Sequence, residues 1–177
     1  MKNDFVMPII VLTLICLFVS ALLAIGNNFT QPVIAAAAAG RAGELRKEII
    51  PQADGFEAVP LDNLPAALTA VYRTTNGAGY IFFVTAMGFG GEVRLICGID
   101  PDGKVIRTAV LEHSETPGFG TPVFHESHAS QYWGRDRDGI ENVAVVSGST
   151  VSSLAMKSGI RYALEAFDII TTQEARQ

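Results

Sequence analysis

The stretch YIFFVTAMGFGGEVRLICGIDPDGKVIRTAVL, residues 80–111, decides the fold. Residues 80–87 are rich in aromatic and β-branched side chains, and residues 93–99 and 105–111 have the same strand-like character. The last two runs flank DPDG at residues 100–103, where proline and glycine beside aspartate are typical of a turn. The pattern therefore predicts an antiparallel hairpin with another strand before it.

Helices are expected on both sides of these strands. Apolar residues recur at helical spacing over residues 152–170, with charged residues elsewhere on the wheel, which predicts an amphipathic C-terminal helix. Residues 143–146 form a strand-like apolar run before it. Residues 33–50 contain helix formers and end at Pro51, so they are expected to form a connector helix.

The N-terminal segment has the properties of a membrane anchor. Residues 5–25 carry no charge, and a helix of that length spans a hydrocarbon core of about 30 Å. The alternative is a cleaved signal peptide with its cut near the alanines at residues 35–39. A polar, turn-prone stretch at residues 26–32 follows the apolar segment. We therefore expect an anchor with its flanks over residues 1–27, a connector over 28–50 and one domain over 51–177.

Composition limits the functions that this chain could have. Its 177 residues suit one compact domain, and 49% hydrophobic residues with 18% charged residues exclude a disordered chain. The net charge is −5, without the clustered lysine and arginine needed to neutralise a phosphate backbone, so nucleic acid is excluded as a partner. Cys16 lies in the apolar segment and Cys97 in a predicted strand, which argues against a disulfide.

Two polar segments could carry chemistry. The first, SGSTVSS at residues 147–153, is a hydroxyl-rich turn before the last helix, an arrangement that aims backbone N–H groups and the positive helix end at an anion. The alternative is a plain N-cap provided by Thr150 or Ser152. The second, EHSETPGFG at residues 112–120, suits the edge of a ligand site, although a solvated loop would have the same composition.

A metal site is not expected. His125 and His128 form an H-x-x-H pair, but they lie in a polar stretch without further ligands at suitable spacing, which is typical of surface residues.

The two polar segments together resemble a known family. Residues 113–120 follow the pattern H-x-E-T-P-G-L-G with Phe119 in place of Leu, and residues 147–152 follow S-G-A-T-x-T/S with Ser149 in place of Ala. The resemblance also includes the single apolar segment, the glycine-rich residues 88–91 and the final helix. The chain is similar to the FMN-binding domain shared by two proteins. These are the G subunit of Rnf electron-transport complexes and the C subunit of Na⁺-translocating NADH:quinone reductase. In length it resembles the Rnf protein.

The resemblance implies an α+β domain with an antiparallel sheet and flanking helices. It also implies FMN joined through a phosphodiester to Thr150 by a flavin transferase that uses FAD. The residues expected around this flavin come from both segments: Ser147, Gly148, Ser149, Val151 and Ser152 beside Thr150, and His113, Glu115, Thr116, Pro117, Gly118 and Gly120 from the other loop.

The implied function is electron transfer within a membrane-bound, ion-translocating Rnf-type complex. The chain would be an electron-transfer subunit rather than a self-sufficient enzyme, with other membrane subunits as partners and residues 5–25 in the cytoplasmic (inner) membrane. The resemblance places the flavin domain on the extracytoplasmic side. One departure is Ala144, where the family has Asp. Two alternatives stay open: a sensory or assembly module that is flavin-free or binds FMN noncovalently, and a stand-alone anchored flavin reductase.

Overall fold

The computed structural model describes residues 6–60 and 64–175. Packing divides the chain into two compact units, Met1–Gly43 and Glu44–Gln177. The second unit begins at Glu44 because the last residues of the first helix pack with the sheet.

Helix α1 (Val6–Ile49) is continuous. Its first part, Val6–Gln31, is long and apolar enough to cross a membrane. The turn expected at residues 26–32 is wrong, since this stretch is helical. Extending a helix adds one hydrogen bond for each residue fixed, whereas a break requires a second nucleation. The Thr30 hydroxyl is accommodated by donating to the Gly26 carbonyl at 2.7 Å.

The second unit contains a five-stranded antiparallel sheet in the order β1-β2-β3-β4-β5, so neighbouring strands are consecutive in the chain. The predicted hairpin and the strand before it are confirmed. Strand β3 is buried on both faces, which explains its continuous apolar run instead of an alternating pattern. The strands are β1 (Phe56–Val59), β2 (Leu68–Thr74), β3 (Tyr80–Met87), β4 (Glu92–Ile99) and β5 (Val105–His113).

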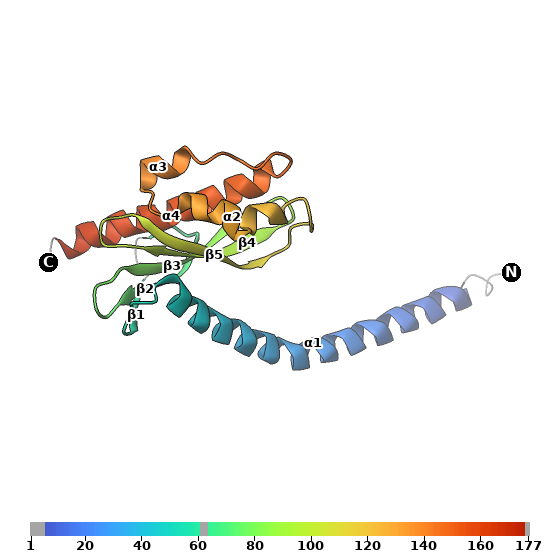
Figure 1. The fold of residues 1–177 in the computed structure, drawn as a ribbon. Coiled ribbons are helices and arrows are strands. Elements are labelled where there is room, and N and C mark those ends of the chain that lie inside the picture. Colours follow the sequence, from blue (N-terminus) through green and yellow to red (C-terminus); the bar gives the residue numbers. More distant parts are fainter. Residues whose placement is uncertain (1–5, 61–63, 176–177) are drawn as a thin grey trace. The chain divides into compact units, whose positions relative to one another are not determined.

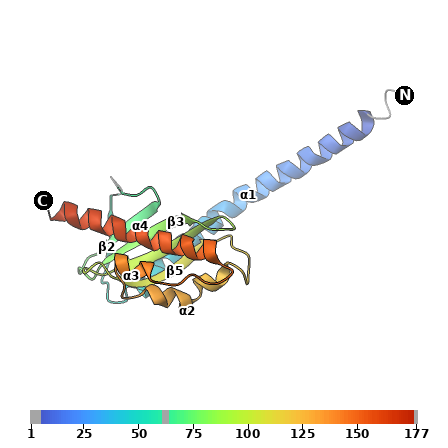
Figure 2. The same ribbon diagram turned by 90° about the horizontal axis from the view of Figure 1, so that it is seen from above.

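Helices cover both faces of the sheet. The predicted C-terminal helix is α4 (Thr150–Glu174), which lies along one face, with the shorter helices on the same side (Figures 1 and 2). On the opposite face, Ile49 and Ile50 pack over Gly98. The domain is therefore α+β, as expected. The short helices after β5 are η1 (Thr121–Phe124), α2 (Glu126–Ala129), η2 (Ser130–Tyr132) and α3 (Arg137–Glu141).

Residues 143–146 form no strand, so that prediction is wrong. Val143 is buried in the core, and the Val146 N–H donates to the Ser153 hydroxyl at 3.0 Å. The amide of Val146 is thus bonded to the first turn of α4 and not to a neighbouring strand. The segment connects α3 to α4 without regular secondary structure.

Glycine lets α4 approach the sheet closely. Gly159 faces β4, and a Cβ at this position would overlap the side chain of Leu95. Met156 and Ile160 on the same face of the helix are fully buried in the core. Helix α4 is therefore seated directly on β3 and β4.

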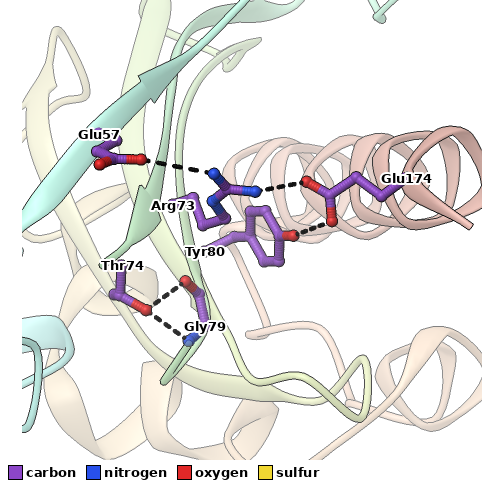
Figure 3. Close-up of polar contacts among 6 residues, drawn as sticks. All are labelled: Glu57, Arg73, Thr74, Gly79, Tyr80 and Glu174. Atoms are coloured by element: carbon purple, nitrogen blue, oxygen red, sulfur yellow. Dashed lines mark hydrogen bonds and ion pairs between the residues drawn. The ribbon is translucent and has the colours of Figure 1, made fainter. Parts of the chain in front are cut away.

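The C-terminal end of α4 is tied to the sheet by polar contacts (Figure 3). Glu174 accepts a hydrogen bond from the Tyr80 hydroxyl at 2.8 Å and from Arg73 at 3.0 Å. Arg73 also lies 3.5 Å from Glu57 on β1. Burial raises the pKa of Tyr80 to about 12, and the Glu174 contact acts in the same direction, so the phenol stays a donor at neutral pH.

The close approach at Gly159 gives a stability prediction. In an exposed helix, replacing glycine with alanine raises the stability by about 1 kcal/mol. Overpacking a buried contact lowers the stability by about 1–3 kcal/mol. We expect Gly159→Ala to lower the unfolding free energy by about 1 kcal/mol. Denaturant unfolding can be followed by the fluorescence of Trp133, the single tryptophan. Gly40→Ala is the control, because it is helical with open space around it. An unchanged or raised stability for Gly159→Ala would contradict the packing.

His128 is buried, contrary to the expected surface position. Its ring packs edge-on against Tyr132 with centroids 5.7 Å apart, and its Nε2 has no hydrogen-bond partner. Burial lowers the pKa of His128 below its ordinary 6.5, because it disfavours the charged imidazolium.

Stability should therefore depend on pH through His128. Below pH 6.5 the unfolded chain gains this proton before the folded chain does, so the unfolding free energy falls as the pH falls. We expect the stability difference between the native chain and His128→Leu to be constant well above pH 6.5 and to shift in favour of the variant as the pH falls through 6.5. Denaturant titrations from pH 5 to 8 test this, and parallel curves for the two proteins would refute it.

Candidate functional site

The antiparallel register brings three segments to one edge of the sheet. Residues 88–91 connect the end of β3 to the start of β4, and Val93 pairs with His113, so the loop after β5 starts at the same edge. Helix α4 runs opposite to β3, because Ala155 near its start packs with Ala86 near the end of β3. The start of α4 therefore meets both loops.

A cavity of about 370 Å³ lies where these segments meet. This volume is in the range of small-molecule sites. Its walls combine two aromatic rings, one carboxylate and the first turn of a long helix. The lining residues are Phe89, Glu115, Thr116, Phe119, Gly120, Gly148, Ser149, Thr150, Val151 and Ser152.

Glu115 joins the two loops. It is 5% exposed, and its Oε1 accepts a hydrogen bond from the Phe89 N–H at 2.7 Å, whereas its Oε2 is buried without a partner. A Cβ on Gly88 or Gly120 would overlap its carboxylate. Both positions therefore require glycine for the loops to close around this side chain. A buried acceptor oxygen without a partner is costly, so it favours a ligand that brings a donor.

Helix α4 begins at Thr150, and Ser149 occupies the N-cap position without a side-chain cap bond. The expected cap from Thr150 or Ser152 is therefore wrong. The first backbone bond runs from the Ser153 N–H to the Ser149 carbonyl at 2.9 Å. The amides of residues 150–152 have no acceptor inside the helix, so they are available to an anion.

The hydroxyl groups of this segment differ in access. Ser149, Ser152 and Ser153 are buried, whereas Ser147 and Thr150 are exposed. Only Thr150 of the exposed pair lines the cavity. The structure thus presents one accessible hydroxyl to the cavity at the start of the helix.

The two aromatic walls of the cavity were not predicted from the sequence, unlike Val151. Phe89 and Phe119 line the cavity although they are 77% and 71% exposed, and Val151 adds a third apolar side chain. Large exposed aromatic rings that flank a cavity suit a flat apolar ligand. The available signal was their position: each phenylalanine has a glycine on both sides in the sequence.

The structure brings together eight of the twelve predicted site residues. His113 instead packs its ring against Phe124, with centroids 4.9 Å apart. Pro117, Gly118 and Ser147 are exposed and do not line the cavity. The eight that line it are Glu115, Thr116, Gly120, Gly148, Ser149, Thr150, Val151 and Ser152.

The donor set of the cavity is not that of a metal site. Glu115 is its only carboxylate, and no group of three or more His, Cys, Asp or Glu that could hold a metal occurs within residues 6–60 and 64–175.

Comparison with known proteins identifies the class of this fold and site. The FMN-binding domain family matches residues 88–165, which contain every residue that lines the cavity. This part of the chain is an FMN-binding domain.

The relatives are named as G subunits of ion-translocating oxidoreductase complexes. The chain is 31% identical over 180 residues to the G subunit of the ion-translocating oxidoreductase complex of Methanosarcina acetivorans, covering 94% of each chain. It is 25% identical over 169 residues to the G subunit of the proton-translocating ferredoxin:NAD(+) oxidoreductase complex of Clostridium ljungdahlii, covering 90% of each. A 60-residue match to the corresponding protein of Vibrio parahaemolyticus reaches 50% identity over 32% of this chain and 28% of that one. The chain belongs to the family of G subunits of Rnf-type ion-translocating oxidoreductase complexes.

The position of Glu115 in the cavity wall gives a prediction about the bound flavin. A carboxylate beside a redox group disfavours its reduction, so Glu115→Gln should make the reduction midpoint more positive by roughly 40 mV, or ~1 kcal/mol for one electron. The flavin should stay bound. Potentiometric titration of the flavin absorbance measures this. Glu112→Gln is the control, because Glu112 is exposed and paired with Arg94 at 3.2 Å. Equal midpoints for the Glu115 variant and the native chain would contradict the expectation.

Proposed function

We propose that this chain is the electron-carrying flavoprotein subunit of a membrane-bound Rnf-type ion-translocating oxidoreductase. Membership of the family of Rnf-type G subunits and the FMN-binding domain support this function. FMN supplies the redox chemistry when bound, since it can accept and release electrons singly. The polypeptide supplies the position and the electrostatic environment.

The cavity residues fit FMN. The unpaired Oε2 of Glu115 is an acceptor that a ring N–H can satisfy, and Phe89 and Phe119 offer apolar surface for a flat ring system. The free amides at the start of α4 suit a phosphate group. The ring system and the phosphate of the cofactor thus each have matching groups in the cavity wall.

We further propose that FMN is attached through a phosphodiester to Thr150. The observation that carries this proposal is that Thr150 is the exposed hydroxyl of the first turn of α4 that lines the cavity, whereas Ser149, Ser152 and Ser153 are buried. Thr116 also lines the cavity with an exposed hydroxyl, but it lies in the loop after β5, away from the amides of the helix start. A flavin transferase would use FAD: the Thr150 Oγ1 attacks the phosphorus on the FMN side, the pyrophosphate bond breaks, AMP leaves and the hydroxyl proton is lost. The chain itself needs no base for this step.

A covalent tether suits this particular domain. The chain carries a net charge of −5, which disfavours a free phosphate monoester of about two negative charges. A phosphodiester retains one charge, beside the helix start. Attachment also makes the binding of the flavin to its site an intramolecular event. The effective concentration of the flavin is then high, so an open site stays occupied.

The first unit supports a single-pass membrane location. Val6–Gln31 has the length and composition of a membrane span. We propose that it anchors the chain in the cytoplasmic (inner) membrane beside the other subunits of the complex. The flavin domain is proposed to lie on the extracytoplasmic side, and residues 1–27, 28–50 and 51–177 to act as anchor, connector and flavin domain.

The alternative is a module of the same fold that lacks covalent flavin. It rests on Ala144, which stands where the family has an aspartate. The nearest upstream acid in the sequence is Glu141, whose carboxylate lies 3.8 Å from both Lys157 and Arg161. Glu141 is therefore engaged with α4 and is no direct replacement for that aspartate.

The attachment site can be tested by intact mass. Thr150→Val should remove all covalent FMN while the domain stays folded, because valine resembles threonine in shape and lacks the hydroxyl. Thr150→Ser should retain attachment, and Ser147→Ala should leave it unchanged. Each protein is co-expressed with the flavin transferase and weighed after denaturation.

Two results would contradict the proposal. Undiminished FMN on Thr150→Val would remove Thr150 from the site. A native chain with the mass of the bare polypeptide, despite abundant transferase, would favour the flavin-free module.

A further inference from the structure

A single hydrogen bond connects the two halves of the cavity wall. The Ser149 hydroxyl donates to the backbone carbonyl of Phe119, across 30 positions of the sequence. Ser149 is 7% exposed, so the contact is shielded from competing water. In the described part of the chain, no other hydrogen bond joins residues 113–120 to residues 144–153.

Each partner is held firmly on its own side. The carbonyl of Ser149 accepts from the N–H and the hydroxyl of Ser153, both at 2.9 Å, so Ser149 is fixed to the first turn of α4. On the other side, the N–H groups of Phe119 and Gly120 both donate to the Thr116 carbonyl at 3.1 Å. The bond between Ser149 and Phe119 thus joins a tight turn to a rigid helix start.

We propose that Ser149 is a latch that sets the opening of the flavin cavity. Its hydroxyl holds the turn of residues 116–120 against the start of α4 and so fixes the ring of Phe119, which lines the cavity together with Thr150. Ser149 is a positioning residue: it acts through the Phe119 backbone. The effect on the cofactor rests on the proposed flavin function, whereas the latch itself can be tested without flavin.

The latch explains a departure in this sequence. Ser149 and Phe119 replace an alanine and a leucine of the family pattern, and alanine has no donor for the Phe119 carbonyl. Phenylalanine is larger than leucine and is 71% exposed here, so its coverage of the cavity depends on how the turn is held. The added hydroxyl supplies that restraint.

Hydrogen exchange on the full-length chain without flavin tests the latch. Ser149→Ala should speed amide exchange at residues 118–120 about fivefold, as expected for the loss of one hydrogen bond. Ser153→Ala is the matched control: its buried hydroxyl bonds to the Val146 N–H and the Ser149 carbonyl but does not contact the turn. The Ser153 N–H still donates to the Ser149 carbonyl in this variant, so Ser149 stays fixed to α4. It should speed exchange at residues 145–146 and leave residues 118–120 unchanged.

Quenching of flavin fluorescence by iodide tests the effect on the cavity in the FMN-loaded chain. Ser149→Ala should increase quenching. Phe119→Leu keeps the backbone carbonyl, so it should increase quenching without changing the exchange of residues 118–120.

The outcomes distinguish a failure of the latch from a failure of the proposed flavin function. Unchanged exchange at residues 118–120 in Ser149→Ala, or an equal increase in Ser153→Ala, overturns the latch whether or not flavin is present. Faster exchange confined to Ser149→Ala with unchanged quenching overturns its control of the cavity. A chain that never carries FMN overturns the proposed function, and the exchange result still decides the latch.

Discussion

The seating of α4 on β3 and β4 is the constraint on which the rest of the structure depends. Gly159 allows the helix to lie directly against Leu95, and Glu174 ties its far end to Tyr80 and Arg73. A helix of 25 residues fixed in its middle and at one end has little freedom at the other. Its first turn is therefore held at the sheet edge where the two loops emerge, which gives an anion-binding helix start its place in the cavity wall.

Around that helix start, the cavity is organised by buried polar groups rather than by surface charge. Glu115 closes the glycine-rich residues 88–91 onto the turn after β5 through the Phe89 amide, and glycines at positions 88 and 120 leave the space for it. Ser149 then joins this turn to α4. One hydrogen bond each from Glu115 and Ser149 thus connects the three segments. The rings of Phe89 and Phe119, which two of these segments carry, stay exposed.

A cavity with exposed aromatic residues in its wall is consistent with electron transfer, because a redox group must come close to its partners. Such a site holds a free anionic cofactor weakly in a domain of net negative charge. The covalent link proposed at Thr150 would resolve this conflict, because a tethered flavin does not need a deep pocket to stay bound.

The sequence by itself determined the strands β3 to β5, the two long helices and the segments that form the site, because hydrophobic periodicity and turn residues are local signals. It failed at residues 26–32 and 143–146, where neighbouring structure overrides local preference. It could not find Phe89 or Phe119 as cavity walls, the burial of His128, or the contact between Ser149 and Phe119. These depend on strand register and helix seating, which bring together residues far apart in the chain. Only the tertiary structure decided that Thr150 is exposed at the cavity while Ser149 and Ser152 are buried.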